Sequence, residues 1–154
     1  MRHGKLGVLI AAVVASVTVP ATASAHTGAA CGTTPEQWVG YFPGFTHYGG
    51  SPGDATFDNV ITLANGVLDV EEQDVPDNYP APYGTPALDG NSLTWAYANT
   101  DPGGPGFSLV FTTDGVTCAN GAVQSFTGNG HFVYSGVLGE TLLESNDPFS
   151  ATRA

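Results

Sequence analysis

Turn-forming residues recur at short intervals along this chain, and their spacing constrains the fold more than any other sequence feature. A typical spacing of about 8–12 residues between turns indicates a sandwich or barrel of short antiparallel strands. The sequence therefore predicts an all-β fold, a small antiparallel β-sandwich or barrel. The turn signals include Asn65-Gly66, Asp89-Gly90, Asp114-Gly115, Asn120-Gly121 and Gly128-Asn129-Gly130.

The best-defined unit is a hairpin around Asn65-Gly66, the strongest short turn signal for two antiparallel strands. Segments 57–64 and 67–71 flank this turn and alternate between apolar and polar residues. A two-residue loop fixes the register, so the apolar residues of both strands share one face. The predicted cross-strand pairs are Leu63 with Leu68, Ile61 with Val70, Thr62 with Asp69 and Val60 with Glu71.

Other segments predict further strands near residues 93–97, 107–112, 123–126 and 131–137. A last apolar piece at 141–143 is expected to form an edge strand, and the tail from about residue 145 is expected to be flexible. Helix signals are sparse. Thr34-Pro35-Glu36-Gln37 fits a capping box with proline at the first helical position, which predicts at most one short helical turn carrying Trp38.

The first 25 residues read as a secretory signal peptide. A basic start is followed by an apolar run at 6–15 and by the small-residue triplet Ala23-Ser24-Ala25. Export is therefore expected, with residues 26–154 forming a single secreted β domain. Polar residues and Pro20 interrupt the apolar run, which disfavours a retained membrane anchor. A lipid-attachment box ending at Cys31 is a weaker alternative, because the usual leucine before the cysteine is absent.

The chain has two cysteines, Cys31 and Cys118, and both follow the predicted cleavage site. In an oxidising extracellular compartment they are expected to form one disulfide. Neither lies in a CxxC pattern or beside a cation that would lower a thiol pKa, so a reactive thiol is disfavoured.

The charge balance excludes several classes of partner. Arg153 is the only lysine or arginine after residue 25, against fourteen aspartates and glutamates. Phosphate binding relies on lysine and arginine, so neither nucleic acid nor an anionic membrane surface is an expected partner. The acidity itself needs no function beyond keeping a secreted protein soluble.

Aromatic residues in loop regions are the candidate binding residues. A long stretch at 72–90 is rich in proline and aspartate and carries Tyr79 and Tyr83. Trp38 and Tyr48 belong to a second aromatic-rich segment, at 38–48. Aromatic residues exposed on loops are typical of surfaces that bind proteins or sugars. We predict binding roles for Tyr48, Tyr79, Tyr83 and Trp38, although Trp38 fits a core position equally well.

The sequence contains no complete catalytic or metal-binding motif. Gly49-Gly50-Ser51-Pro52-Gly53 matches G-x-S-x-G, but Pro52 lacks the N–H that an oxyanion hole takes from the residue after the serine. His26, His47 and His131 show no metal-ligand spacing. The carboxylates at 69–77 match no calcium loop, although calcium stays open. No catalytic residue, metal or cofactor is predicted.

These observations favour a secreted, non-enzymatic protein that recognises an extracellular protein or glycan through loops rich in proline, glycine and aromatic residues. One alternative is a subunit or adaptor of a secreted assembly, or an inhibitor of a secreted hydrolase. Another is a small secreted hydrolase that uses histidine and carboxylate groups, with His131 as the residue to test. The composition resembles that of small secreted proteins of high-GC Gram-positive bacteria, but the sequence suggests no family.

Overall fold

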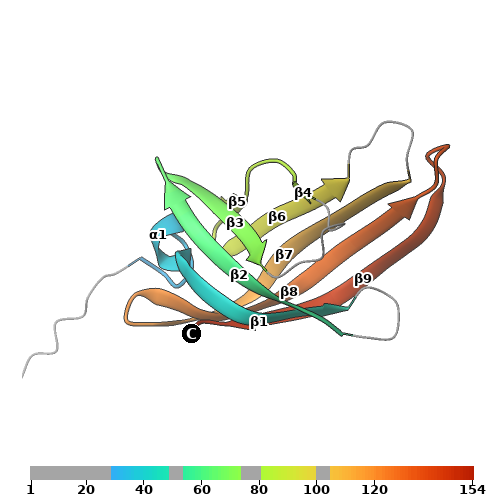
Figure 1. The fold of residues 1–154 in the computed structure, drawn as a ribbon. Coiled ribbons are helices and arrows are strands. Elements are labelled where there is room, and N and C mark those ends of the chain that lie inside the picture. Colours follow the sequence, from blue (N-terminus) through green and yellow to red (C-terminus); the bar gives the residue numbers. More distant parts are fainter. Residues whose placement is uncertain (1–28, 49–53, 74–80, 100–104) are drawn as a thin grey trace, which may run out of the picture.

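The computed structural model describes residues 29–48, 54–73, 81–99 and 105–154, with the backbone alone at 45–48 and 54–57. Over these residues the protein is all-β, with one short helix, α1 (Pro35–Trp38) (Figure 1). The predicted fold class is confirmed. The strands are β1 (Gly40–Tyr48), β2 (Asp54–Ala64), β3 (Val67–Gln73), β4 (Ala81–Pro82), β5 (Ala87–Asp89), β6 (Ser92–Asn99), β7 (Gly106–Ala119), β8 (Ala122–Ser135) and β9 (Thr141–Thr152).

The strands form two antiparallel layers that join along one side. Their hydrogen-bonded order is β3-β2-β1-β9-β8-β7-β6-β4, and β5 pairs with β6. The link between β1 and β9 consists of two residue pairs, Thr46 with Ser150 and His47 with Phe149. The layer of β1–β3 therefore lies across the longer layer of β6–β9, as Figure 1 shows.

The hairpin of β2 and β3 has the predicted register. Leu63 pairs with Leu68 and Ile61 with Val70 around a turn in which Asn65 has a φ of 53° and Gly66 a φ of 79°. The turn needs a left-handed backbone at both residues, and asparagine and glycine adopt that conformation more readily than other residues. Ile61, Leu68 and Val70 are buried, so the hairpin covers the core with its apolar face.

Aromatic rings from both layers fill the core. The ring of Trp95 on β6 stacks on Phe111 with centroids 5.1 Å apart, and Phe149 lies 5.6 Å from Trp95 in an edge-on arrangement. Phe126 on β8 contacts Phe42 on β1 at 5.0 Å, which ties the second layer to the first. The hydroxyl of Tyr97 donates to the carbonyl of Val70 on β3, so the layers are also hydrogen-bonded.

Two predicted turns lie inside long strands. Gly128-Asn129-Gly130 belongs to β8, which is continuous where the sequence predicted two separate strands. Glycines are needed there because a Cβ on residue 130 would stand 3.0 Å from the ring of Phe111, and one on residue 128 would overlap Phe149. Asp114-Gly115 lies within β7 at a shift of register between Thr113 and Gly115. These glycines make room for core rings and a bulge.

The C-terminal tail is ordered, contrary to the prediction of a flexible end from residue 145. Residues 145–152 continue β9 along β8, and Phe149 and Ala151 are buried. The guanidinium of Arg153 then donates to the carbonyls of Val123, Val39 and Gln37. Two buried apolar side chains and these three hydrogen bonds hold the tail in place.

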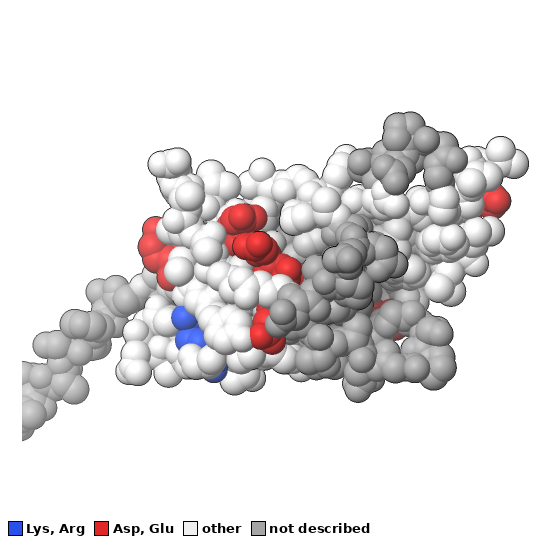
Figure 2. Space-filling model, in the orientation of Figure 1, with Lys and Arg blue, Asp and Glu red and all other residues white. Residues whose placement is uncertain are grey.

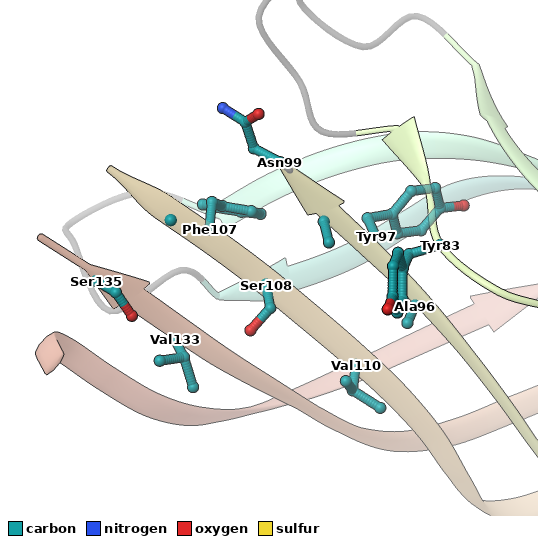
Figure 3. A pocket seen from close by; sticks show the side chains of 11 residues that line it. Tyr83, Ala96, Tyr97, Asn99, Phe107, Ser108, Val110, Val133 and Ser135 are labelled. Carbon is teal, nitrogen blue, oxygen red and sulfur yellow. The ribbon is translucent and has the colours of Figure 1, made fainter. Parts of the chain in front are cut away.

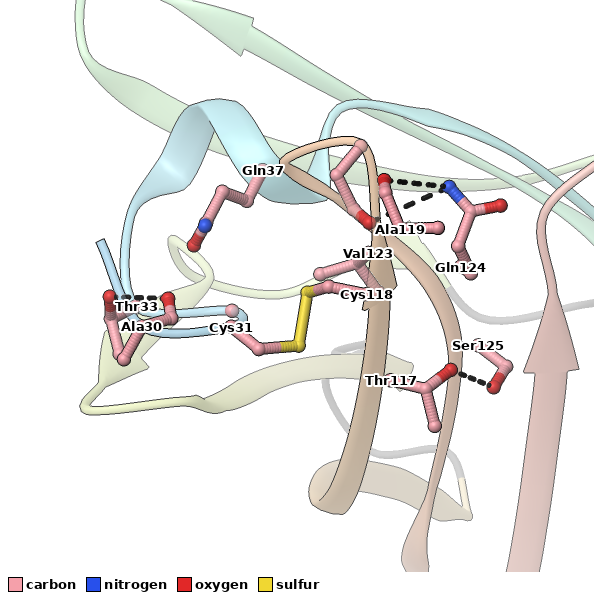
Figure 4. Close-up of a disulfide and its surroundings, with 12 residues drawn as sticks. Ala30, Cys31, Thr33, Gln37, Thr117, Cys118, Ala119, Val123, Gln124 and Ser125 are labelled. Carbon is pink, nitrogen blue, oxygen red and sulfur yellow. Dashed lines mark hydrogen bonds between the residues drawn. A yellow bond between two sulfur atoms is a disulfide. The ribbon is translucent and has the colours of Figure 1, made fainter. Parts of the chain in front are cut away.

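The predicted disulfide and helical turn are confirmed, and they lie together (Figure 4). Cys31 and Cys118 are bonded, with Cα atoms 5.6 Å apart and a sequence separation of 87 residues. In the helical turn the side chain of Gln37 accepts a hydrogen bond from the backbone N–H of Thr34 at 3.1 Å, as a capping box requires. The disulfide therefore fastens the segment before α1 to the far end of β7.

Candidate binding groove

A shallow groove of about 410 Å³ lies on the outer face of β6, β7 and β8 (Figure 3). Leu93, Trp95 and Tyr97 point into the core, so the alternate residues of β6 point outward. The outward residues of the three strands then lie side by side in cross-strand rows. The groove floor consists of Ala96, Ala98, Ser108, Val110, Val133 and Ser135.

The hollow arises from the small size of the central side chains. Ala96 pairs with Val110, and Ala98 pairs with Ser108, which in turn pairs with Val133. Methyl and hydroxymethyl groups in the middle of the sheet leave space between taller neighbours. The groove is thus built on strands, whose positions are more rigid than those of loops.

Tyr83 forms the wall of the groove next to β6. Its backbone N–H donates to the carbonyl of Ala96 at 2.8 Å, which continues the pairing of β4 with β6. Its side chain is 62% exposed. In Figure 3 the Tyr83 ring stands on the same side of the sheet as Ser108, Val110 and Val133, whereas Tyr97 points to the opposite side. An anchored backbone therefore presents an exposed aromatic ring beside a small-residue floor.

The described residues that line the groove carry no formal charge. They include no aspartate, glutamate, lysine, arginine or histidine. Its polar groups are hydroxyls, on Tyr83, Ser108 and Ser135, together with the amide of Asn99. In a chain with fourteen carboxylates, an uncharged hollow of this size favours a neutral ligand that combines apolar surface with hydrogen-bonding groups.

The four predicted binding residues have different positions. Tyr83 lines the groove. Tyr79 lies outside the described residues, and of Tyr48 only the backbone, in β1, is described. Trp38 is fully buried and its Nε1 donates to the carbonyl of Gly32 at 2.8 Å, which is the core alternative that the sequence left open. The sequence did not predict the groove floor, because alanines and serines carry no signal until strand register places them together.

A histidine–carboxylate pair lies beside the groove floor. His131 on β8 pairs with Val110, and its Nε2 lies 2.9 Å from Oε1 of Glu144 on β9. The two side chains are 44% and 57% exposed. Among the described residues, no serine or threonine hydroxyl is hydrogen-bonded to His131. The sequence did not single out Glu144, since only the register of β8 and β9 brings it to His131.

The acidic stretch at 69–77 does not form a metal centre within the described residues. Asp69 and Glu71 are exposed on β3, while Glu72 is buried on its opposite face. Asp74 and Asp77 lie outside the described residues. Where the chain is described, no group of three or more His, Cys, Asp or Glu side chains is placed to hold a metal ion. Figure 2 shows carboxylates on the face that carries β2 and β3.

No family model, no curated protein sequence and no solved structure matches this chain. Over the residues that the structure describes, no helix has the length and apolarity needed to cross a membrane.

Proposed function

We propose that this is a secreted, non-catalytic binding protein that holds a neutral, hydroxyl-rich ligand, a glycan, in the groove beside Tyr83. The observation that carries the proposal is the 62% exposed ring of Tyr83 next to an uncharged groove of about 410 Å³. That volume lies within the range of small-molecule sites, about 300–1,000 Å³.

The chemistry of the groove supports a sugar better than a charged ligand. A sugar ring has an apolar C–H face, which packs on an aromatic ring, and hydroxyls around its edge, which need hydrogen-bond partners. Tyr83 offers the ring, and Ser108 and Ser135 offer hydroxyls that both donate and accept. Among the described lining residues, an anionic ligand would find no cation and a cationic ligand no carboxylate.

The test is titration of the protein with neutral oligosaccharides, namely hexamers of β-1,4-glucose, β-1,4-xylose, α-1,4-glucose and N-acetylglucosamine, followed by calorimetry and by NMR. We expect at least one to bind and to shift the amide resonances of Ala96, Ser108 and Val133. Tyr83→Ala should lower the affinity for that oligosaccharide five- to thirtyfold, which corresponds to about 1–2 kcal/mol of binding free energy. Tyr83→Phe keeps the ring and should retain most of the affinity.

A second variant tests the groove floor separately from the ring of Tyr83. Ser108→Leu fills the floor and leaves Tyr83 in place, so it should abolish binding at this site. Combining Tyr79→Ala with Tyr83→Ala then measures what Tyr79 adds. If none of the oligosaccharides binds at millimolar concentration, or if binding survives both Tyr83→Ala and Ser108→Leu, the glycan proposal is wrong.

A hydrolase is the second candidate, and the pair of His131 and Glu144 is the observation that favours it. A histidine oriented by a carboxylate is a common general base, and this one lies next to the groove. The measurement is turnover of chromogenic ester and glycoside substrates by wild type and by His131→Ala. Turnover that His131→Ala abolishes would support the enzyme, whereas no turnover by the wild type would exclude it for these substrates.

A further inference from the structure

Among the described strands, only β8 pairs with residues 141–147 of β9. On one side β9 pairs with β8 along its whole length, from Thr152 opposite Ser125 to Thr141 opposite Ser135. On the other side β1 meets β9 at Phe149 and Ser150 alone. Among the described strands none pairs with that side of residues 141–147. A strand edge of this kind presents unpaired N–H and C=O groups to another extended chain.

The same hairpin exposes four aliphatic side chains. Val137 is 63% exposed, Leu138 91%, Leu142 56% and Leu143 42%. Figure 1 shows the hairpin of β8 and β9 projecting at one end of the molecule, and Figure 2 shows that end as mainly white with a carboxylate in red near its tip. Apolar side chains gathered on a projecting element are typical of a protein interaction site.

Hydrogen bonds join the residues of the hairpin tip to one another. The N–H of Gly136 donates to the carbonyl of Glu140 at 2.8 Å, and that of Gly139 donates to the carbonyl of Gly136 at 2.9 Å. The carboxylate of Glu140 accepts from the N–H of Leu138 at 3.2 Å. These bonds keep Val137 and Leu138 turned outward, so the ordering cost of a contact is reduced in advance.

The terminal strand β3 is protected against such pairing, whereas residues 141–147 of β9 are not. Its outward residues include Asp69 and Glu71, and its apolar residues Leu68 and Val70 are buried. The carbonyl of Val70 also accepts a hydrogen bond from the hydroxyl of Tyr97. Charged side chains on an edge strand are the usual protection against unwanted pairing. Leu142 and Leu143 are uncharged and give the β9 edge no such protection.

The charge near the β9 edge indicates which kind of partner strand it would bind. Glu140 and Glu144 flank the exposed leucines, so a favourable partner carries cations. A second copy of the secreted domain expected at residues 26–154 cannot supply them. Arg153 is the only lysine or arginine after residue 25, and its guanidinium already donates to the carbonyls of Val123, Val39 and Gln37.

We infer that residues 141–147 accept an extended segment of a partner protein, carrying lysine or arginine between apolar residues, as an additional β-strand. Backbone hydrogen bonds to the β9 edge provide affinity in this mode of recognition, and alternate side chains provide specificity. Leu143 and Glu144 lie on opposite faces of β9, so the apolar residues of the segment pack on Leu143 and its cations lie on the other face, near Glu144. The site is separate from the Tyr83 groove and does not depend on the proposed function.

The experiment uses synthetic nine-residue peptides and ¹⁵N-labelled protein. The first peptide alternates valine with lysine, the second replaces each lysine with glutamate, and the third is the first with alternate backbone N–H groups methylated. We expect the lysine peptide to shift the amide resonances of residues 141–147. The glutamate and N-methylated peptides should each bind at least tenfold more weakly.

Two matched variants locate the contact. Leu142→Lys places a like charge on the β9 edge and should weaken the lysine peptide at least tenfold. Val67→Lys makes the same change at a 50% exposed aliphatic residue on β3 and should leave that affinity unchanged. Three results would overturn the inference: no shifts at millimolar peptide, equal affinity for the lysine and glutamate peptides, or shifts confined to β3. Sedimentation that shows a dimer broken by Leu142→Lys would overturn it too, because the occupant would then be a second copy.

Discussion

Gly128 on β8 pairs directly with Phe149 on β9, and the ring of Phe149 occupies the space where a side chain at residue 128 would stand. A Cβ there would also overlap the carbonyl oxygen of Thr112 on β7. The glycine is thus required by the packing of three neighbouring strands. It lets the ring of Phe149 lie across the sheet and reach Trp95 and Phe111 in the core.

We therefore expect Gly128→Ala to lower the free energy of unfolding by about 1–3 kcal/mol, because the added methyl must displace backbone as well as a packed ring. Urea unfolding followed by tryptophan fluorescence measures the effect. Gly106→Ala is the control, since its Cβ would meet the nearest atom, Cβ of Ser135, at an ordinary 3.5 Å. Equal stability of the two variants would show that the β8–β9 contact relaxes freely.

Removal of the disulfide should destabilise the fold more than Gly128→Ala does. The bond closes a loop with a sequence separation of 87 residues, and the chain-entropy argument gives about 4–5 kcal/mol for a loop of that length. Replacing both Cys31 and Cys118 by serine should lower the urea midpoint by the corresponding amount. Reduced wild type is the internal control and should behave like the double variant. An unchanged midpoint would mean that the unfolded chain keeps these segments together without the bond.

Asp58 should make the stability sensitive to acid. The hydroxyl of Tyr41 and, to a lesser extent, the N–H of Gly44 donate to its carboxylate and lower its pKa in the folded state below the ordinary 3.8. A group with a lowered folded pKa stabilises the protein above the unfolded pKa, and that contribution is lost as the pH falls through the folded pKa. The loss therefore begins near pH 3.8 and continues below it.

The corresponding variants are Asp58→Asn, which removes the titrating group, and Tyr41→Phe, which removes the main donor. Both should flatten the fall in urea midpoint between about pH 5 and about pH 2 relative to wild type. Tyr41→Phe should have the smaller effect, because Gly44 still donates. If the urea midpoint of Asp58→Asn falls as steeply with decreasing pH as that of the wild type, the acid sensitivity comes from other carboxylates.

Arg153 should stabilise the fold through its hydrogen bonds to three backbone carbonyls. It joins Val123 on β8 to Val39 and Gln37, and its guanidinium lies 5.0 Å from the ring centroid of Phe42. Arg153→Met keeps an apolar stem and leaves the carbonyls without these donors. We expect a loss of about 1.5–3 kcal/mol, since hydrogen bonds to a charged group fall in that range.

Arg153→Lys is the informative companion, because one ammonium group cannot reproduce the planar fork that reaches all three carbonyls. Thermal unfolding should place it between wild type and Arg153→Met. A stability of Arg153→Lys equal to that of the wild type would show that charge alone, over the Phe42 ring, is what matters.

Local patterns predicted the local parts of the fold. The register of the β2–β3 hairpin followed from Asn65-Gly66, and the capped turn before Trp38 followed from Thr34 and Gln37. Both depend on residues only a few positions apart, where backbone preference and side-chain alternation act directly. The interpretation of Gly128-Asn129-Gly130 as a turn was wrong, because glycine serves close packing as well as turning.

The candidate binding residues divide in the same way. Tyr83 was identified because a tyrosine between proline and glycine is difficult to bury, and it is exposed. The groove floor was not identified, since Ala96, Ser108 and Val133 become neighbours only when β6, β7 and β8 pair in register. The pair of His131 and Glu144, which are thirteen residues apart, has the same origin.

The order of amino acids was enough to establish the all-β class, the β2–β3 hairpin register, the helical turn and which two cysteines were available to bond. These depend on turn chemistry, on alternation of side chains and on the presence of just two thiols. Folding in three dimensions was needed to establish that β9 continues to Thr152 and that the outer faces of three strands enclose a groove. It was also needed to establish that, among the described strands, only β8 pairs with residues 141–147. Those features depend on how distant strands align and on which edge each layer leaves unpaired. Such contacts are long-range, and no local pattern encodes them.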